Sequence, residues 1–492
     1  MMTTRRTFLE GIGAAALLPL SGHIARAEAP LLNVSTRTLD VKGKAATVFG
    51  VSGRNGRQGI HAREGERFAG AIRNGTQDPL VMHWHGQVHA AFDQDRSRPK
   101  GGELATGAED RHDFLLTPGT HWMHAHQLTE QQLLAAPMVT IERDAVDAQE
   151  VVLMLHDFSF RSPMEILAVL GGSSAHSGHG AQSGAMPQTS MPGGMDHGSM
   201  MQGRGMARIG MRPGGGMMPG METMGIHAND VQYDAYLAND RTLDDPEVVR
   251  VERSGRVRLR IINGGTATAF FVDTGALDAE CIAVDGSRCH PLRGRLFPLA
   301  QGQRIDLMVS IPAAGGSFPI FAQVEADRRR TGIILATTGA SITKLGDSAP
   351  ENAPNTSLTL DERLRARYPL PDRKPDRTFH LMLGEEAGYR WTINGKIHGQ
   401  HEPLNAKVGE RIEIMFMNPT SMMHPMHLHG HHFQLVGTRA GRFPGPVRDT
   451  IIVPPHTPAI VAVDLDKPGD WFLHCHHLYH MATGMMTELR VS

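Results

Sequence analysis

The sequence predicts an all-β protein assembled from antiparallel β-sandwiches. Short segments rich in Val, Ile, Leu and Thr alternate with turns of Gly, Pro, Asn and Asp, and long amphipathic helical patterns are few. This spacing is typical of sandwiches and differs from an alternation of strands and helices. Strands are expected, for example, at residues 150–155, 257–262 and 411–416.

Phrases that recur at intervals of domain size support the same fold class. A Gly-Glu-Arg or Gly-Gln-Arg triplet occurs three times, and three four-residue phrases with an Asn followed by Gly or Pro resemble one another. The triplets begin at Gly65, Gly302 and Gly409, and the asparagines are Asn74, Asn263 and Asn418. This self-similarity indicates that one sandwich is used three times.

The length agrees with three domains, because 492 residues at roughly 150 residues per domain give about three. We place the boundaries near 146 and 347, so that the domains span 31–145, 146–346 and 347–492. The formal net charge of -2 gives no electrostatic reason to expect nucleic acid or an anionic membrane as a partner. We expect a monomer.

The N-terminus is typical of a Tat-type export signal. It combines the twin arginines Arg5 and Arg6, an apolar run over 11–20 and an Ala-Arg-Ala site that ends at Ala27. The apolar run is too short to span a bilayer, which needs about 20 residues. We therefore predict that residues 1–27 are removed and that the mature protein, without a membrane span, reaches the periplasm.

A segment at 171–226 interrupts the strand pattern. It consists of Gly, Ser, Met and Pro with scattered His, and it holds eleven of the 28 Met. Such a composition cannot bury enough apolar surface to order itself, which predicts a flexible insertion in the second domain. Because thioethers select Cu(I), we interpret it as a copper-collecting arm; the alternative is a flexible insertion whose Met are incidental.

Only three cysteines occur, which excludes a disulfide framework. Cys281 and Cys289 flank Asp285-Gly286, a turn signal, so they approach each other if this stretch is a hairpin. Two readings stay open for this pair: a disulfide, or two buried free thiols.

The third cysteine lies in the stretch richest in metal-binding side chains. Cys475 stands between His474 and His476, with His480 five residues and Met485 ten residues after it. A Cys, two His and a weak axial Met form a blue-copper electron-transfer site. If the stretch is a strand, His474 and His476 face away from Cys475, so that one covalent segment contacts two metal sites.

Three more His-x-His pairs accompany this stretch, and each presents two imidazoles on one face of a strand. They are His83 with His85, His124 with His126, and His427 with His429. His424, three residues before the last pair, is the natural second His for the blue-copper site. The chain thus offers eight imidazoles for a cluster, together with His424, Cys475, His480 and Met485 for a mononuclear site.

These four motifs resemble, in order and spacing, the copper motifs of multicopper oxidases. The resemblance covers essentially the mature chain. It implies three cupredoxin-like Greek-key β-sandwich domains and four copper ions per chain, with a trinuclear cluster between the first and third domains. Carried over position by position, it assigns type 2 copper to His83 and His427. It assigns type 1 copper to His424, Cys475, His480 and axial Met485. It assigns the type 3 pair to His85, His124, His126, His429, His474 and His476.

The resemblance also implies the reaction. A reducing substrate gives single electrons to type 1 copper, and the electrons pass through Cys475 to His474 and His476. Four electrons then reduce dioxygen to two waters. Asp93 and Asp95 are the two candidates for proton delivery. Met481 occupies a position at which some relatives carry a carboxylate.

The sequence features are compatible with more than one reducing substrate. The Met-rich segment, the export signal and Met422 resemble bacterial cuprous oxidases of copper tolerance, in which Met422 matches a Cu(I) site residue. The carboxylate partner of that site is replaced here by Thr420. A laccase-like oxidase of phenolic reductants is the alternative enzyme, and a periplasmic copper-sequestering protein is the alternative outside that class.

Overall fold

The computed structural model describes residues 30–171 and 228–492. The predicted export signal and nearly all of the Met-rich insertion lie outside the described residues. The described chain forms strands in six sheets, with three short α-helices, which confirms the predicted all-β class. No described helix has the length and apolar character needed to cross a membrane.

The first domain consists of two four-stranded sheets, ordered β2-β1-β4-β6 and β3-β8-β7-β5. Two 3-10 turns follow the strands of the first two His-x-His motifs: η1 (Phe92–Gln94) comes after β5, and η2 (Leu128–Gln132) comes after β7. The strands are β1 (Leu31–Val41), β2 (Lys44–Gly53), β3 (Ile60–Arg63), β4 (Arg67–Asn74), β5 (Met82–His85), β6 (Glu109–Leu115), β7 (Gly119–Ala125) and β8 (Ala135–Ile141).

The second domain pairs a six-stranded sheet, β10-β9-β12-β17-β14-β15, with a five-stranded sheet, β11-β19-β18-β13-β16. Helix α1 (Pro163–Val169) follows β9, and its N-terminus carries a capping box between Ser162 and Glu165. The strands are β9 (Gln149–Phe158), β10 (Ala235–Ala238), β11 (Val248–Arg250), β12 (Arg256–Asn263), β13 (Phe270–Asp273), β14 (Ala279–Val284), β15 (Ser287–Gly294), β16 (Leu296–Leu299), β17 (Arg304–Ser310), β18 (Ser317–Val324) and β19 (Arg330–Ala336).

The third domain pairs the sheet β21-β20-β23-β29-β25-β26, to which β27 adds, with the sheet β22-β31-β30-β24-β28. Helix α2 (Thr359–Arg363) precedes these strands, and α3 (Leu478–Ala482) follows β30. The strands are β20 (Arg377–Glu386), β21 (Arg390–Ile393), β22 (Leu404–Ala406), β23 (Arg411–Met417), β24 (His424–Leu428), β25 (Phe433–Thr438), β26 (Gly441–Arg442), β27 (Val447–Arg448), β28 (Thr450–Val453), β29 (Pro458–Asp464), β30 (Gly469–Cys475) and β31 (Met486–Val491).

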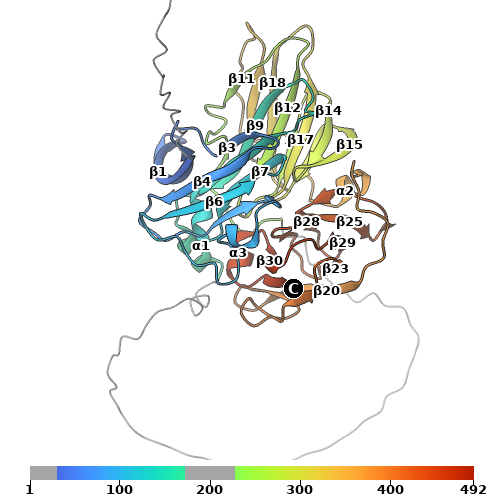
Figure 1. Cartoon of the computed structure of the whole chain (residues 1–492). Helices are drawn as coiled ribbons and strands as arrows, with labels where there is room; N and C mark the ends of the chain where they lie inside the picture. The colour runs from blue at the N-terminus through green and yellow to red at the C-terminus, as the bar shows by residue number, and fades with distance from the viewer. Residues whose placement is uncertain (1–29, 172–227) are drawn as a thin grey trace, which may run out of the picture.

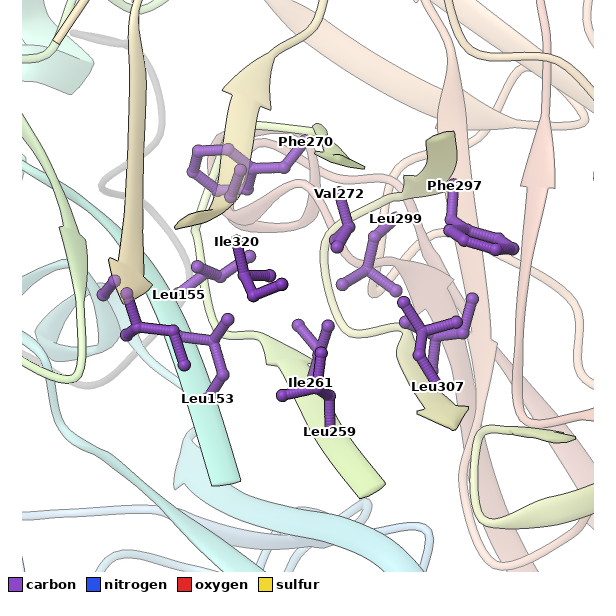
Figure 2. Packing of buried hydrophobic residues seen from close by; sticks show 14 of the residues in the cluster. Leu153, Leu155, Leu259, Ile261, Phe270, Val272, Phe297, Leu299, Leu307 and Ile320 are labelled. Atoms are coloured by element: carbon purple, nitrogen blue, oxygen red, sulfur yellow. The ribbon is translucent and has the colours of Figure 1, made fainter. Parts of the chain in front are cut away.

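The strands predicted at 150–155, 257–262 and 411–416 lie inside β9, β12 and β23. Figure 1 shows the three strand groups in succession, blue to cyan, green to yellow, and orange to red. The boundaries at 146 and 347 stay predictions. Each group has its own apolar core; Figure 2 shows the second, where Leu153, Ile261 and Leu307 face Phe270 and Ile320 of the opposite sheet.

The strand pairing repeats from domain to domain. In each domain the first strand pairs in parallel with a strand that ends at or next to an asparagine: β1 with β4, β9 with β12, and β20 with β23. In the facing sheets, β5, β13 and β24 follow the asparagine loops, and β7, β18 and β30 pair with them. The structure therefore confirms one sandwich used three times.

The repeated asparagines are buried and bind the backbone in the same way. Each side-chain amide donates to two carbonyls that lie on different segments, and each Oδ1 accepts from the N–H two residues later. The carbonyl pairs are Asp78 and Leu104 for Asn74, Thr268 and Leu299 for Asn263, and Met422 and Val453 for Asn418. Of the Gly-x-Arg triplets, those at Gly65 and Gly409 precede the asparagine strands, whereas the one at Gly302 precedes β17.

Candidate metal centre

The four His-x-His motifs lie on equivalent strands of the first and third domains. Strand β5 carries both histidines of the first motif, whereas β7, β24 and β30 each carry the first His of their motif and end one residue before the second. The register sets His83 opposite His124, and His427 opposite His474. The equivalent strands of the second domain, β13 and β18, contain no histidine.

All eight imidazoles predicted for a cluster converge where these two strand pairs meet. Seven of them are buried, and His126 is half-buried. The ring of His83 stacks on that of His429 at 3.8 Å, and the ring of His85 on that of His427 at 3.7 Å. The group, called the imidazole cluster below, consists of His83, His85, His124, His126, His427, His429, His474 and His476.

Hydrogen bonds fix which nitrogen of each ring is free. His83 binds Asp95 Oδ2 through Nδ1 at 2.6 Å, and His427 binds the carbonyl oxygen of Asp449 through Nδ1 at 2.9 Å. With Nδ1–H donated, a neutral ring has its lone pair on Nε2. The two Nε2 atoms face each other at 3.2 Å. Two facing lone pairs repel each other, whereas a shared metal ion turns both into ligands.

The same arrangement recurs at a second point of the cluster. His474 donates Nδ1–H to the carbonyl of Cys475 at 2.9 Å, and His429 donates to that of Ser97 at 3.1 Å. Their Nε2 atoms are 3.0 Å apart, and His126 Nε2 lies 3.1 Å from His474 Nε2. These three imidazoles form one compact donor group.

His85 uses the opposite nitrogen. Its Nε2 binds Asp449 Oδ1 at 3.0 Å, so its free Nδ1 faces His124 Nε2 at 3.4 Å. The Nδ1 of His124 lies 3.0 Å from both the Ala125 carbonyl and Glu130 Oε2. His476 Nε2 is buried and has no hydrogen-bond partner among the described residues, as expected for a nitrogen that awaits a metal.

Burial disfavours the charged form of most of these rings. Desolvation first, and then the neighbouring histidines, hold the pKa well below the ordinary 6.5 at five positions: His85, His126, His427, His429 and His476. Neutral imidazoles with fixed tautomers are the form that binds transition metals. The cluster therefore fits metal ions on the chemistry of its donors.

A second donor group lies around Cys475. Its Sγ is 3.7 Å from His424 Nδ1 and 3.7 Å from His480 Nδ1, and these two nitrogens are 3.2 Å apart. All three residues are fully buried, and Met485 beside them is also fully buried. Backbone hydrogen bonds hold Met485 in place, from Cys475 N to Met485 O and from Met485 N to His480 O. This group, the Cys475 site, has the donors of a blue-copper centre.

Without a metal ion, burial favours the neutral thiol of Cys475. Burial raises its pKa well above the ordinary value. A bare thiolate is therefore unfavourable at this position, and a bound metal ion is what stabilises it. Because Cys475 is covalently joined to His474 and His476, the backbone connects this site directly to the imidazole cluster.

The structure separates the two candidate acids. Turn η1 leaves Asp93 exposed, whereas Asp95 is 9 % exposed and bonds to His83. A second acid was missed by sequence reasoning: Glu130, 3 % exposed, lies in η2 beside His124. Desolvation raises the pKa of Glu130, and the neighbouring His124 opposes this shift. The only local signal is its position four residues after His126.

Asp449 connects all three domains at the cluster, and its role was also missed. Its carboxylate accepts from His85 of the first domain and from Arg304 of the second. Arg304, Asp449 and the neighbouring Asp285 are all fully buried. No motif near Asp449 in the sequence signals this role, and Arg304 stands out only as the last residue of the triplet that begins at Gly302.

The remaining predicted residues are placed as follows. Met422 is buried in the third core, and Thr420 Oγ1 lies 2.9 Å from His424 Nε2, at the outer edge of the Cys475 site. Met481 is 9 % exposed on α3. Of the histidines outside the two donor groups, His121 and His432 flank Asp449, His431 lies near Asp466, and His477 lies near Asp230; His89 is half-buried.

The hairpin predicted between Cys281 and Cys289 is present as β14 and β15, and Asp285 and Gly286 in its turn both have positive φ. A register shift after Cys281 sets this residue opposite Leu292. Both cysteines are buried free thiols, which agrees with the second of the two readings.

Comparison with known proteins supports one family along the chain. Three family models, each described as multicopper oxidase, match residues 33–145, 201–341 and 371–492. The multicopper oxidase MmcO of Mycobacterium tuberculosis is 29% identical over 87% of this chain and 80% of its own length. Copper resistance protein A of Escherichia coli is 24% identical over 100% of this chain and 99% of its own length.

Laccases and solved structures are also similar. Laccase-7 of Oryza sativa subsp. japonica is 21% identical over 87% of this chain and 84% of its own. The structure of Fet3p, a multicopper oxidase that functions in iron import, has the same fold, with a TM-score of 0.72 and 15% identity over 94% and 90% of the two chains. Three such domains imply type 1, type 2 and type 3 copper, and both donor groups fit these ions. The chain belongs to the multicopper oxidase family and is an oxidoreductase.

Proposed function

We propose that this protein is a periplasmic cuprous oxidase of copper tolerance, exported by the Tat route, which couples the oxidation of Cu(I) to the reduction of dioxygen to water. The observation that carries the oxidase part is the complete donor set: eight converging imidazoles and a buried Cys, joined through one segment of backbone. A protein that only sequesters copper needs no such connection between two kinds of site.

The proposal that Cu(I) is the substrate has different support. The likeness to Copper resistance protein A extends over the whole chain, and the segment at 171–226 offers eleven thioethers, which are soft ligands for Cu(I). A laccase-like activity on phenols is the second candidate, and the likeness to laccases favours it.

We assign the donors as the family pattern does. His424, Cys475, His480 and Met485 would hold type 1 copper. His83 and His427, whose Nε2 atoms face each other, hold type 2 copper. The type 3 pair is bound by His85, His124, His126, His429, His474 and His476. Copper at these sites would supply the one-electron chemistry that connects a reducing substrate to the four-electron reduction of dioxygen.

The protein contributes orientation, a covalent path and protons. Asp95, Asp449 and three backbone carbonyls hold the rings of the cluster in the tautomers that leave metal-binding nitrogens free. Cys475 provides the path from the Cys475 site to His474 and His476. Asp95, near the surface and bonded to His83, delivers protons for water formation, because the four-electron reduction of dioxygen consumes four protons.

The choice between the two substrates can be tested with the Met-rich segment. In one variant residues 172–225 are deleted; in a matched variant of full length only the eleven Met between 186 and 224 become Ser. Oxygen consumption is measured with Cu(I) and with a phenol. We expect kcat/KM for Cu(I) to fall at least tenfold in both variants while the phenol rate holds. Wild-type oxidation of Cu(I) no faster than that of phenol, with neither changed by the variants, would contradict the cuprous assignment.

A further inference from the structure

Soft metal-binding side chains gather on the outer face of the third domain, turned away from its core. Strands β20 and β23 pair in parallel there, with His380 opposite Met415 and Met382 opposite Met417 (Figure 1 labels both strands). These four residues are called the outer patch below. None of them belongs to the imidazole cluster or to the Cys475 site.

The alternation of the two strands directs the outer patch away from the core. Leu381 and Phe416, which pair between the two rows, are 1% and 0% exposed and belong to the core that also holds Cys475. Residues directly before and after a buried strand position point to the opposite face. Accordingly, the two patch residues on β20 are exposed, and the two on β23 are half-buried. The sheet of β20 and β23 therefore lies between the outer patch and the Cys475 site.

The spacing of the four side chains suits one small ion. Paired strands lie about 4.8 Å apart, and residues on one face of a strand recur about every 6.6 Å. Because Met has three rotatable bonds, its thioethers can turn their sulfur atoms toward a common point. The side chain of Asn394 fixes the edge of this frame. Its Oδ1 accepts from Met382 N at 2.7 Å, and its Nδ2 donates to the carbonyl of His380 at 3.2 Å.

The composition of the outer patch differs from the rest of the same face. The outward face of an antiparallel or mixed sheet usually carries polar side chains. At the start of β23 it does, because Arg411 pairs with Asp464 and Glu413 pairs with Arg442. Toward the end of β23 thioethers replace these charges. Of the five Met in the described part of the chain that are not buried, three lie in the outer patch, which indicates a role for their sulfur atoms.

The donors select the kind of ion. Thioethers are soft ligands that favour Cu(I), and imidazole also suits copper, whereas Mg²⁺ and Ca²⁺ require oxygen ligands. No carboxylate belongs to the outer patch, so a monovalent ion is held there at a lower electrostatic cost than a divalent one. The exposed side chains of His380 and Met382 let the ion exchange directly with solvent.

We propose that the outer patch is a binding site for Cu(I), separate from the four copper positions assigned above. The ion is bound and released as Cu(I), and no electron or proton is transferred. The inference does not depend on whether Cu(I) or a phenol is the reducing substrate, because the site only has to bind the ion.

The test uses Ag(I), a soft monovalent ion that stands in for Cu(I) without being oxidised. In every protein compared, the eleven Met between 186 and 224 are replaced by Ser, so that the Met-rich segment contributes no thioether. The copper-loaded, full-length proteins are dialysed against Ag(I), and the silver bound per chain is measured by mass spectrometry.

Two site variants are compared with one matched control. The first combines Met382→Leu, Met415→Leu and Met417→Leu, and the second is His380→Gln. The control is Met164→Leu, which removes an exposed thioether on α1, outside the outer patch. Leu keeps the apolar surface and removes only the sulfur, so the triple variant distinguishes an ion site from an apolar contact surface. Type 1 absorption shows that each variant is folded and holds its blue copper.

We expect the triple variant to bind one Ag(I) fewer per chain than the control, or to bind it at least about tenfold more weakly. His380→Gln should weaken the same binding event, because it removes one of the donors. Phenol oxidation should be unchanged in all variants, since the outer patch lies apart from both donor groups. Equal silver binding by the triple variant and the control overturns the site.

Discussion

Replacing Asp449 by Asn should weaken the three-domain junction and the copper cluster together. The carboxylate is fully buried, and its Oδ1 accepts from Arg304 Nη1 at 2.7 Å, His85 Nε2 at 3.0 Å and Thr450 Oγ1 at 2.9 Å. The amide removes the charge, so Arg304 keeps only Asp285, at 3.7 Å, as a counter-ion. Breaking a buried ion pair from one side costs about 3–5 kcal/mol.

The loss should be visible both in stability and in metal retention. At roughly 2–4 °C per kcal/mol, the apparent Tm of the copper-loaded protein should fall by about 6–20 °C. Because the acceptor of His85 Nε2–H is weakened, the affinity of the cluster for copper should fall by about 10–100-fold. Differential scanning calorimetry measures the first effect, and copper content after dialysis against a chelator measures the second.

Two further variants separate these effects. Arg304→Met also breaks the ion pair but leaves the bond between His85 and Asp449, so Tm should fall while copper is retained. Asp470→Asn disrupts an exposed pair with Arg490, which is worth about 0–1 kcal/mol, and should change neither quantity. If Asp449→Asn keeps the wild-type Tm and copper content, Asp449 neither stabilises the junction nor orients His85.

Three other outcomes are expected. Cys475→Ser should lose the blue absorption and the oxidase activity, while copper analysis still finds metal at the imidazole cluster; retained turnover would exclude Cys475 as the electron path. Asp95→Asn should slow dioxygen reduction in stopped flow and leave type 1 reduction intact, whereas the exposed Asp93→Asn should behave as wild type. Desolvation raises the pKa of the buried Glu142, but Arg258 and Arg260 outweigh it and lower the pKa from 4.5 to about 2. This lowered pKa stabilises the folded protein by about 3 kcal/mol above pH 4.5, and the stabilisation is lost as the pH falls toward 2. Glu142→Gln should therefore be less stable than wild type in urea at pH 7, with a difference that shrinks below pH 4.5; a difference independent of pH would refute this assignment.

The fold and most of the donor set could be read from the sequence because both depend on local spacing. Alternation along a strand is enough to put His83 and His85 on one face, and turn residues mark where such strands end. The same two-residue alternation explains why Cys475 faces away from His474 on the same strand. These features need no knowledge of which strands meet.

Residues that act through distant contacts could not be found in this way. Asp449 bonds to His85 across 364 positions of the chain, and the sequence near these two residues contains no pattern that predicts the contact. Asp230 reaches His477 from another domain in the same manner. The ambiguity between Asp93 and Asp95 had a different cause, because only the 3-10 turn at 92–94 decides which carboxylate faces inward.

The buried asparagine that recurs in each domain has a consequence for how copper is acquired. In the third domain Asn418 anchors the loop that leads to His424, and in the second domain Asn263 anchors the equivalent loop next to strands without histidine. Because the loop closes in the same way where no metal can bind, its shape is a property of the polypeptide. The loop that leads to the first ligand of the blue-copper site is thus preorganised by the polypeptide itself.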